Sequence, residues 1–143
     1  RTMRDVFELL QLLEPYLIEW FVQEHSQHQM QDLHRLVDKM ELLDDGDHLS
    51  YRLLDTQFHW AIYSQHYNES AVNLWRQKRL ILQTMHSNLT TRASRASKGI
   101  DEHRQMLACI EKRDTKGTLA VLEQHITESS QYWSRYIDKF KKS

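Results

Sequence analysis

Glycine and proline are scarce in this chain: its 143 residues include three Gly and one Pro. Leu, Glu, Gln, Lys and Arg are abundant instead, and these residues lose little side-chain freedom when they enter a helix. The length allows one compact domain with its own hydrophobic core and leaves no room for a second. Together these features predict a single all-α domain.

Other features are scarce or absent, and each argues against a class of protein. The single cysteine, Cys109, cannot form a disulfide within the chain, which favours a reducing compartment, and we expect the cytoplasm. The formal net charge of -1 provides no broad positive field for phosphates, so we expect no DNA binding by this chain alone. No apolar run approaches the roughly 20 residues that span a bilayer. No leader precedes the first helix, and we expect no membrane partner.

Apolar residues recur at helical spacing along six segments of the chain. These segments cover residues 6–22, 26–43, 48–65, 71–89, 100–112 and 115–140. Pro15 should kink or briefly interrupt the first segment, because proline removes a helical hydrogen bond. Residues 90–99 are poor in large apolar groups, which predicts a loop or a frayed helix end.

Local signals mark several helix ends. Ser26 followed by Gln29 has the form of a capping box. Asp47 and Asp114 can each cap the helix that follows, because a carboxylate accepts hydrogen bonds from the first free N–H groups of a helix. Asn68 can take the left-handed conformation that ends a helix.

Four residues form a candidate metal site. Asp55 and His59 lie four residues apart, so on a helix their side chains share one face and can bind one metal ion. His103 and His125 each lie beside apolar residues of a predicted helix, which directs both toward the interior. Buried imidazoles need partners for their polar atoms, and a metal ion would provide one. Alternatively, these are ordinary half-buried histidines, because the chain has nine His and residues on separate helices need not converge.

Two stretches of sequence resemble a known protein family. They are Asp55-Thr56-Gln57-Phe58-His59 followed by Asn68, and Glu102-His103-Arg104 followed by Ala108, Ile110, Asp114, Ala120 and His125-Ile126. Together with Leu13-Glu14-Pro15, they resemble the FadR C-terminal domain, which is the effector-sensing half of many GntR-family bacterial transcription regulators. The resemblance spans essentially the whole chain.

The resemblance implies an antiparallel bundle of about six to seven helices, with a divalent metal ion held by Asp55, His59, His103 and His125. Three nitrogen ligands and one oxygen ligand suit zinc first, with nickel, cobalt and manganese as alternatives. In a six-coordinate site, two positions would remain for water or for a small-molecule carboxylate effector. A winged-helix domain, expected upstream because the chain begins at Arg1 without Met, would bind DNA as part of a homodimer.

The sequence does not determine which residue would balance the negative charge of such an effector. Where family members often carry an arginine in the first helix, this chain has Gln11. We therefore expect that Arg52, one turn before Asp55, or Arg79 on the fourth predicted helix balances an anionic effector, or that the effector is less anionic than a di- or tricarboxylate. Gln83 is a weaker candidate for the same pocket. Each arginine can equally be interpreted as a solvated surface residue.

Two other classes compete with a sensor domain. A hydrolase-like enzyme could use open metal positions to activate water, but the H-E-x-x-H motif is absent. Glu102, the nearest carboxylate to His103 in sequence, should face elsewhere on its helix. A purely structural bundle would leave both motifs unexplained, so we expect a ligand-sensing domain that is not an enzyme.

Two expectations concern residues outside the motifs. His34 and His66 are expected at the surface. The last predicted helix carries an apolar stripe that is expected in the core, with a far side that could form a dimer surface. Its members are Trp133, Tyr136, Ile137 and Phe140.

Overall fold

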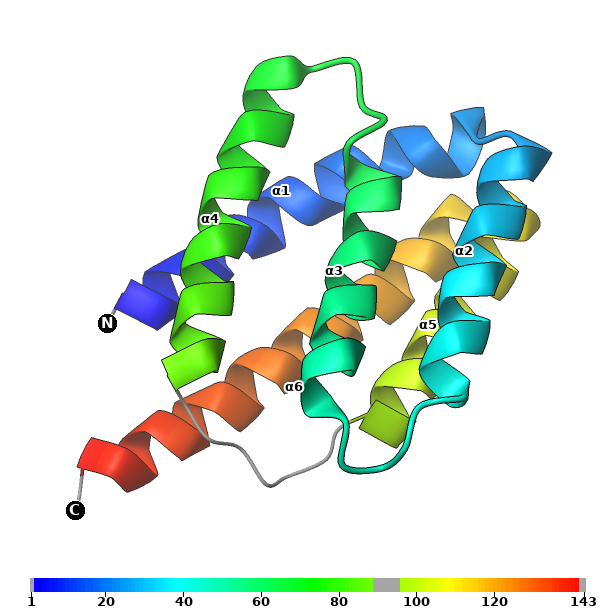
Figure 1. Cartoon of the computed structure of the whole chain (residues 1–143). Helices are drawn as coiled ribbons and strands as arrows, with labels where there is room; N and C mark the ends of the chain where they lie inside the picture. Colours follow the sequence, from blue (N-terminus) through cyan, green and yellow to red (C-terminus); the bar gives the residue numbers. More distant parts are fainter. Residues whose placement is uncertain (1, 89–95, 142–143) are drawn as a thin grey trace.

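The computed structural model describes the backbone of residues 2–88 and 96–141, and the side chains of residues 3–84, 99–131 and 134. This part of the chain contains no strand and forms six helices: α1 (Thr2–Glu24), α2 (Gln27–Glu41), α3 (His48–Tyr63), α4 (Glu69–Asn88), α5 (Ala96–Glu111) and α6 (Thr115–Lys141). The expected all-α fold is confirmed (Figure 1). None of the described helices has the length and apolar character needed to cross a membrane.

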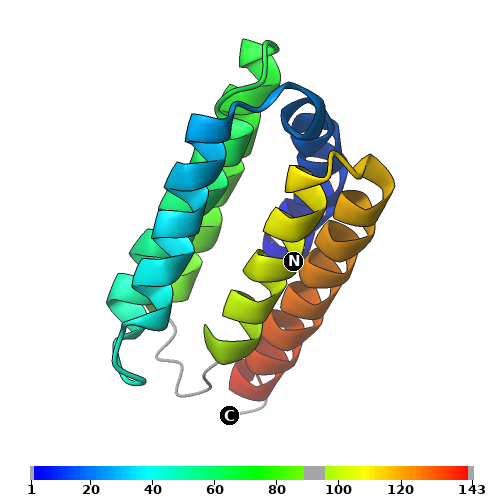
Figure 2. The same cartoon turned by 90° about the vertical axis from the view of Figure 1, so that its right-hand side faces the viewer.

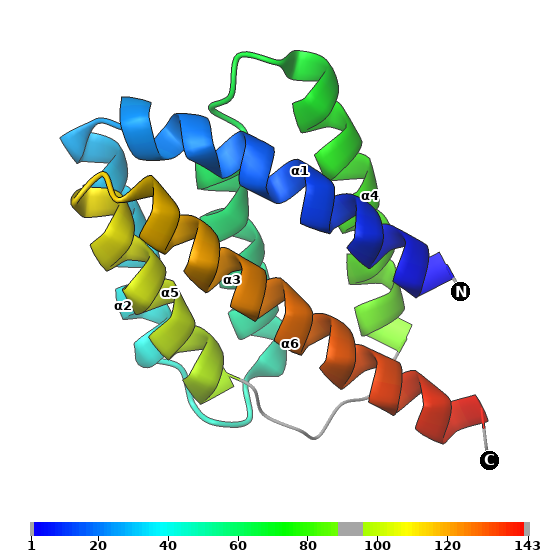
Figure 3. The same cartoon turned by 180° about the vertical axis from the view of Figure 1, so that it is seen from behind.

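The six helices form two layers of three. Figure 1 shows α4, α3 and α2 side by side in the front layer, and Figure 2 shows that layer facing a second one made of α1, α5 and α6. In the back layer, α1 and α6 cross the molecule side by side and α5 lies against α6 (Figure 3). Short turns join α2 to α3 and α5 to α6, so these pairs run antiparallel. The space between the layers is where side chains of α3 meet those of α5 and α6.

Three helices begin with the predicted caps. The Ser26 hydroxyl accepts a hydrogen bond from the Gln29 N–H at 3.1 Å, and Gln29 Oε1 accepts one from the Ser26 N–H at 2.8 Å. The carboxylates of Asp47 and Asp114 each accept a hydrogen bond from the N–H three residues later, at 3.1 and 2.9 Å. Each contact satisfies a donor that has no partner inside its own helix, which typically stabilises a protein by about 1 kcal/mol.

One predicted helix end is wrong. Asn68 is not left-handed; its Oδ1 accepts a hydrogen bond from the Ala71 N–H at 3.1 Å and caps the start of α4. The turn after α3 is so short that Asn68 already belongs to the next helix. Helix α5 begins at Ala96, inside the segment predicted as a loop or a frayed helix end, of which residues 90–95 lie outside the described chain. Helix α1 continues through Pro15 without a break.

Burial of one face of α1 explains why the helix tolerates its proline. Leu17, Ile18, Phe21 and Val22 are fully buried, and α1 packs against α3, α4, α5 and α6. Each large side chain contributes about 1.5 to 3 kcal/mol on burial. Their sum exceeds the roughly 3 kcal/mol that proline costs inside a helix, so tertiary packing outweighs the local penalty at Pro15.

Arg113 connects the end of α5 to the end of α1. Its backbone is left-handed, with φ 56°, and its guanidinium donates to the carbonyl oxygens of Val22, Gln23 and His25 at 3.1, 2.6 and 3.2 Å. The last turn of α1 has no basic residue of its own, so Arg113 provides the positive charge that free carbonyls at a helix end attract. Figure 3 shows these two helix ends side by side.

His66 is buried, and the prediction of a surface position is wrong. Its side chain is 6% exposed, and its ring contacts those of Tyr16 and Tyr67, with centroids 4.6 and 4.3 Å away. Its Nδ1 accepts a hydrogen bond from the Asn68 N–H at 2.9 Å. Burial lowers the pKa of the His66 imidazole below its ordinary value of 6.5. His34, which was also predicted at the surface, is partly exposed.

We expect His66→Ala to lower the free energy of unfolding by about 1 to 3 kcal/mol near pH 7.5, because it removes the ring contacts with Tyr16, Trp20 and Tyr67 and the acceptor of the Asn68 N–H. The deficit should shrink below about pH 6.5. There the unfolded wild-type chain binds a proton at His66 that the folded imidazole resists, and the variant lacks this contribution to acid destabilisation. Urea unfolding at both pH values measures this.

The exposed His28 on α2 provides the control for this measurement. His28→Ala should change the free energy of unfolding by less than about 0.5 kcal/mol. Equal losses for the two variants, or a His66→Ala deficit that does not change with pH, would contradict the role assigned to the buried ring.

Candidate metal centre

Three of the four predicted ligands meet between the two layers. Asp55 and His59 lie one turn apart on α3, and His103 approaches them from α5. Asp55 Oδ1 lies 3.2 Å from His59 Nε2 and 2.9 Å from His103 Nε2. One ligand atom of each residue falls within 4.8 Å of the other two, a spacing that could hold a metal ion.

His125 of α6 lies next to this group. The ring centroids of His59 and His103 are 5.7 Å apart, and the ring of His125 lies 6.1 and 6.0 Å from them, so the three rings form a nearly equilateral triangle. The Nδ1 atom of His125 lies 2.5 Å from an oxygen of Glu102. The three imidazoles therefore come together from three helices, although His125 is not among the residues whose ligand atoms lie within 4.8 Å of one another.

The two innermost imidazoles lack hydrogen bonds. His59 and His103 are each 1% exposed, and all four of their ring nitrogens are buried without a hydrogen-bond partner in the described part of the chain. The short distances to Asp55 Oδ1 do not have hydrogen-bond geometry. Buried polar atoms without partners are costly and rare. A metal ion would provide a partner for one nitrogen of each ring, and the donor set fits such an ion.

The protonation states around Asp55 also suit a metal ion. Burial alone would raise the pKa of the Asp55 carboxyl, but the charge of His59 and the contacts with His103 outweigh it and hold that pKa well below its ordinary value. Burial lowers the pKa of His103, and this effect exceeds the opposing influence of Asp55. The two directions favour an ionised Asp55 carboxylate and a neutral His103 imidazole, which are the forms that bind metals.

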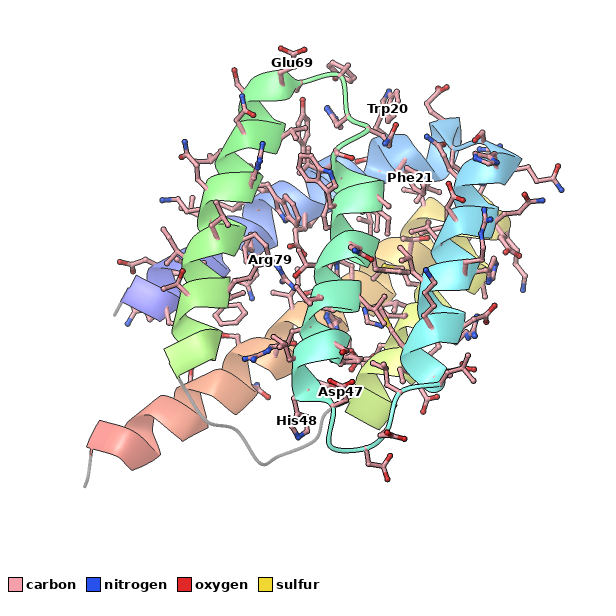
Figure 4. All side chains as sticks on the ribbon, viewed as in Figure 1. Trp20, Phe21, Asp47, His48, Glu69 and Arg79 are labelled. Atoms are coloured by element: carbon pink, nitrogen blue, oxygen red, sulfur yellow. The ribbon has the colours of Figure 1, made fainter. Side chains whose placement is uncertain are left out.

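Arg79 belongs to the site, and its interpretation as a solvated surface residue is wrong. Its side chain is 16% exposed, and its NH2 group donates to Asp55 Oδ2 at 2.8 Å. Figure 4 shows Arg79 extending from α4 toward α3. Its Nε atom is buried and has no hydrogen-bond partner in the described part of the chain. The Arg79 guanidinium therefore binds one oxygen of the Asp55 carboxylate, and its Nε–H has no hydrogen-bond acceptor among the described residues.

The remaining effector candidates lie at different places. Gln83, one turn after Arg79 on α4, donates from Nε2 to Thr56 Oγ1 at 2.5 Å, and so lies on the same flank of α3 as the site. Arg52 is partly buried on α3, one turn before Asp55. Gln11 is exposed on α1, and this exposure argues against a place for it in a buried pocket.

Glu102 faces the interior, and the prediction that it faces elsewhere is wrong. It is 9% exposed although its neighbour His103 is also buried. Helix α5 packs against α1, α2 and α6, so neighbours cover it on more than one side and two consecutive residues can both be buried. Glu102 uses this position to contact His125 of α6.

A second buried carboxylate supports the site from α1, and sequence reasoning did not give it a role. Glu14 is 3% exposed and accepts hydrogen bonds from the Tyr63 hydroxyl at 3.3 Å and from Trp75 Nε1 at 2.9 Å. Burial and the negative charge of Glu14 raise the pKa of Tyr63 well above its ordinary value, so the phenol stays protonated and donates. Tyr63 in turn stacks on His59, with centroids 5.9 Å apart and planes 6° from parallel. The only sequence signal was its place in the Leu13-Glu14-Pro15 match.

Comparison with known families agrees with this arrangement. The sequence model of the FCD domain matches residues 5–128. The chain belongs to the FCD domain family. The resemblance deduced from the two motifs is thereby confirmed, whereas no curated protein matches the chain.

Two solved structures share the fold of this FCD domain. "Streptococcus agalactiae GntR" is 26% identical, with a TM-score of 0.75 over 92% of this chain and 59% of that one. A GntR-family transcriptional regulator from Pseudomonas syringae pv. tomato str. DC3000 is 19% identical, with a TM-score of 0.76 over 97% of this chain and 58% of that one. The chain therefore spans about three fifths of the length of the structures that it matches.

We expect the purified domain to bind one divalent metal ion and to lose it when a ligand is removed. His103→Ala and His125→Ala should each weaken metal affinity by about 100-fold or more, because each removes one of only four protein donors. They should also abolish the rise in unfolding temperature on metal addition. Elemental analysis after competition with a chelator measures the first effect, and His28→Ala is the control. If His103→Ala retained stoichiometric metal as tightly as the wild type, the site would be assigned wrongly.

Proposed function

We propose that this FCD domain is the ligand-sensing part of a GntR-type transcription regulator, and that it binds a divalent metal ion through Asp55, His59, His103 and His125. The observation that best supports the metal is the pair of buried imidazoles with four unpartnered nitrogens beside an ionised carboxylate. One solved relative bears the name GntR and the other is called a GntR-family transcriptional regulator. Both are longer than this chain, which leaves room for a winged-helix domain that would bind DNA.

The chemistry of the donors narrows the choice of ion. Three imidazole nitrogens and one carboxylate oxygen suit zinc, with nickel, cobalt and manganese as alternatives. In a six-coordinate arrangement, two positions remain for water or for an effector. The protein's residues would hold the ion between α3, α5 and α6, and the ion would offer a positively charged docking point between the layers.

A small carboxylate is the effector that suits the polar side chains beside the proposed metal ion. Arg79 holds one oxygen of Asp55 and keeps its buried Nε–H without a partner. A carboxylate that reaches the open metal positions could accept a charge-assisted hydrogen bond from this group. Gln83 and Thr56 add polar atoms on the same flank. Arg79 can therefore take the role for which Gln11, exposed on α1, is badly placed.

An enzyme and a purely structural bundle are weaker alternatives. A metal-dependent hydrolase needs a general base beside the reacting water. The described carboxylates nearest to the cluster already have partners: Asp55 contacts two imidazoles and Arg79, and Glu102 contacts His125. A structural bundle would leave the ring nitrogens of His59 and His103 without hydrogen bonds, with only the nearby Asp55 carboxylate facing Nε2 of each. A sensor domain accounts for both observations.

A thermal-shift screen of small organic acids tests the proposal. A ligand that binds only the native state stabilises it by about 2.7 kcal/mol at a hundredfold excess over its dissociation constant. Organic acids should raise the unfolding temperature of the metal-loaded protein and leave the chelator-treated protein and His125→Ala unchanged. A sugar or an acyl chain that fills an apolar pocket would stabilise all three. Stabilisation by the best ligand that does not depend on metal would show that the ion is structural and that the docking proposal is wrong.

We also propose that the protein is a homodimer, because a pair of winged-helix domains reads paired half-sites on DNA. The apolar stripe that the sequence suggested for core and dimer surface, residues 133, 136, 137 and 140, lies outside the described side chains. We expect a weak, concentration-dependent dimer for the domain alone. Sedimentation over a range of concentrations measures it, and a strict monomer at high concentration would contradict the expectation.

A further inference from the structure

The imidazoles of His59, His103 and His125 differ in the hydrogen bonds of their ring nitrogens. The Nδ1 and Nε2 atoms of His59 and His103 are all without hydrogen bonds in the described part of the chain. In His125, by contrast, Nδ1 lies 2.5 Å from Glu102 Oε2. Among the described residues, His125 is therefore the one imidazole of the three whose Nδ1 has a hydrogen bond to a carboxylate.

We propose that Glu102 is the positioning residue of the site, which orients the His125 ring so that Nε2 is the nitrogen left to bind the metal ion. This inference rests on the proposed metal site. An ionised carboxylate can only accept a hydrogen bond, so the contact requires Nδ1 of His125 to carry the hydrogen. The lone pair is then on Nε2, the same nitrogen that His59 and His103 direct toward Asp55.

The contact is well placed for this role because both partners are shielded from water. The side chains of Glu102 and His125 are 11% and 16% exposed. In such surroundings a charge-assisted hydrogen bond is stronger than one at the surface. A carboxylate that accepts from a ligand imidazole fixes the tautomer and raises the basicity of the nitrogen that binds the metal.

The position of Glu102 in the chain links two ligands that belong to different helices. Glu102 and His103 are consecutive residues of α5, and α5 packs along α6, which carries His125. One short segment therefore contributes a candidate ligand and also orients the candidate ligand of the neighbouring helix. This explains why Glu102 is buried at all, since an unpaired buried carboxylate would destabilise the fold.

The competing interpretation is a structural ion pair that merely joins α5 to α6. The chain offers a matched control for that case. Glu111, also on α5, pairs with His34 of α2 at a partly exposed position away from the cluster. A structural pair should affect stability alone, whereas a positioning residue should affect metal affinity through His125.

The test measures zinc affinity, by competition with a chelator, for the full chain and for Glu102→Gln, Glu102→Asp and Glu111→Gln. We expect Glu102→Gln to weaken zinc binding by about 10- to 100-fold, because it removes the charge and keeps the shape. Glu102→Asp, which keeps the charge, should recover part of that loss. Glu111→Gln should bind zinc as the wild type does.

Two further measurements separate positioning from a general loss of structure. In the His125→Ala background, Glu102→Gln should cause no additional loss of zinc affinity, because its effect passes through the missing ring. Nitrogen NMR of the metal-free protein should show the hydrogen of His125 on Nδ1 in the wild type and a mixture of tautomers in Glu102→Gln. The first result is not expected from a pair that only stabilises the fold, and the second shows whether Glu102 sets the tautomer that leaves Nε2 for the metal ion.

The outcomes distinguish this inference from the proposed function. If the wild type binds zinc and Glu102→Gln binds it equally well, or if the losses from Glu102→Gln and His125→Ala simply add, Glu102 is structural and the inference is wrong while the metal site stands. If the wild type binds no zinc or other divalent ion, the proposed metal site is wrong and the inference fails with it.

Discussion

The arrangement of the site depends on the buried carboxylate of Asp55. Its Oδ1 atom lies 3.2 and 2.9 Å from Nε2 of His59 and His103, and its Oδ2 atom accepts a hydrogen bond from Arg79 at 2.8 Å. A carboxylate removed from water would otherwise be strongly destabilising. Because its partners come from α3, α4 and α5, the requirement to keep this charge compensated fixes three helices relative to one another.

Two other buried carboxylates, those of Glu102 and Glu14, contact side chains around that centre. Glu102 contacts Nδ1 of His125. Glu14 accepts a hydrogen bond from the Tyr63 hydroxyl, and the Tyr63 ring stacks on His59. Through Glu14, helix α1 is connected to the same group of side chains as α3 and α4. A shift of the His59 ring would therefore be opposed by contacts that reach the first helix, so the centre is part of the packing of the whole bundle.

Much of the fold could be predicted because helical periodicity and capping are local properties. All six helices are recognised from apolar spacing, and the caps at Ser26, Asp47 and Asp114 follow from side chains that reach a backbone N–H three residues later. The boundaries are less certain wherever packing extends a helix. Helix α1 begins before the predicted segment, and Met3, which lies in that extension, is buried in the core.

The sequence by itself determined the helices and the pairing of Asp55 with His59, because residues four apart share one face of any helix. Only the tertiary structure decided that His103 and the His125 ring lie beside that pair, that Arg79 turns inward to Asp55, and that Glu102 is buried. These outcomes depend on how many neighbours surround each helix and at what angle they cross. Spacing along one helix carries no information about either quantity, because both are set by the packing of all six helices together.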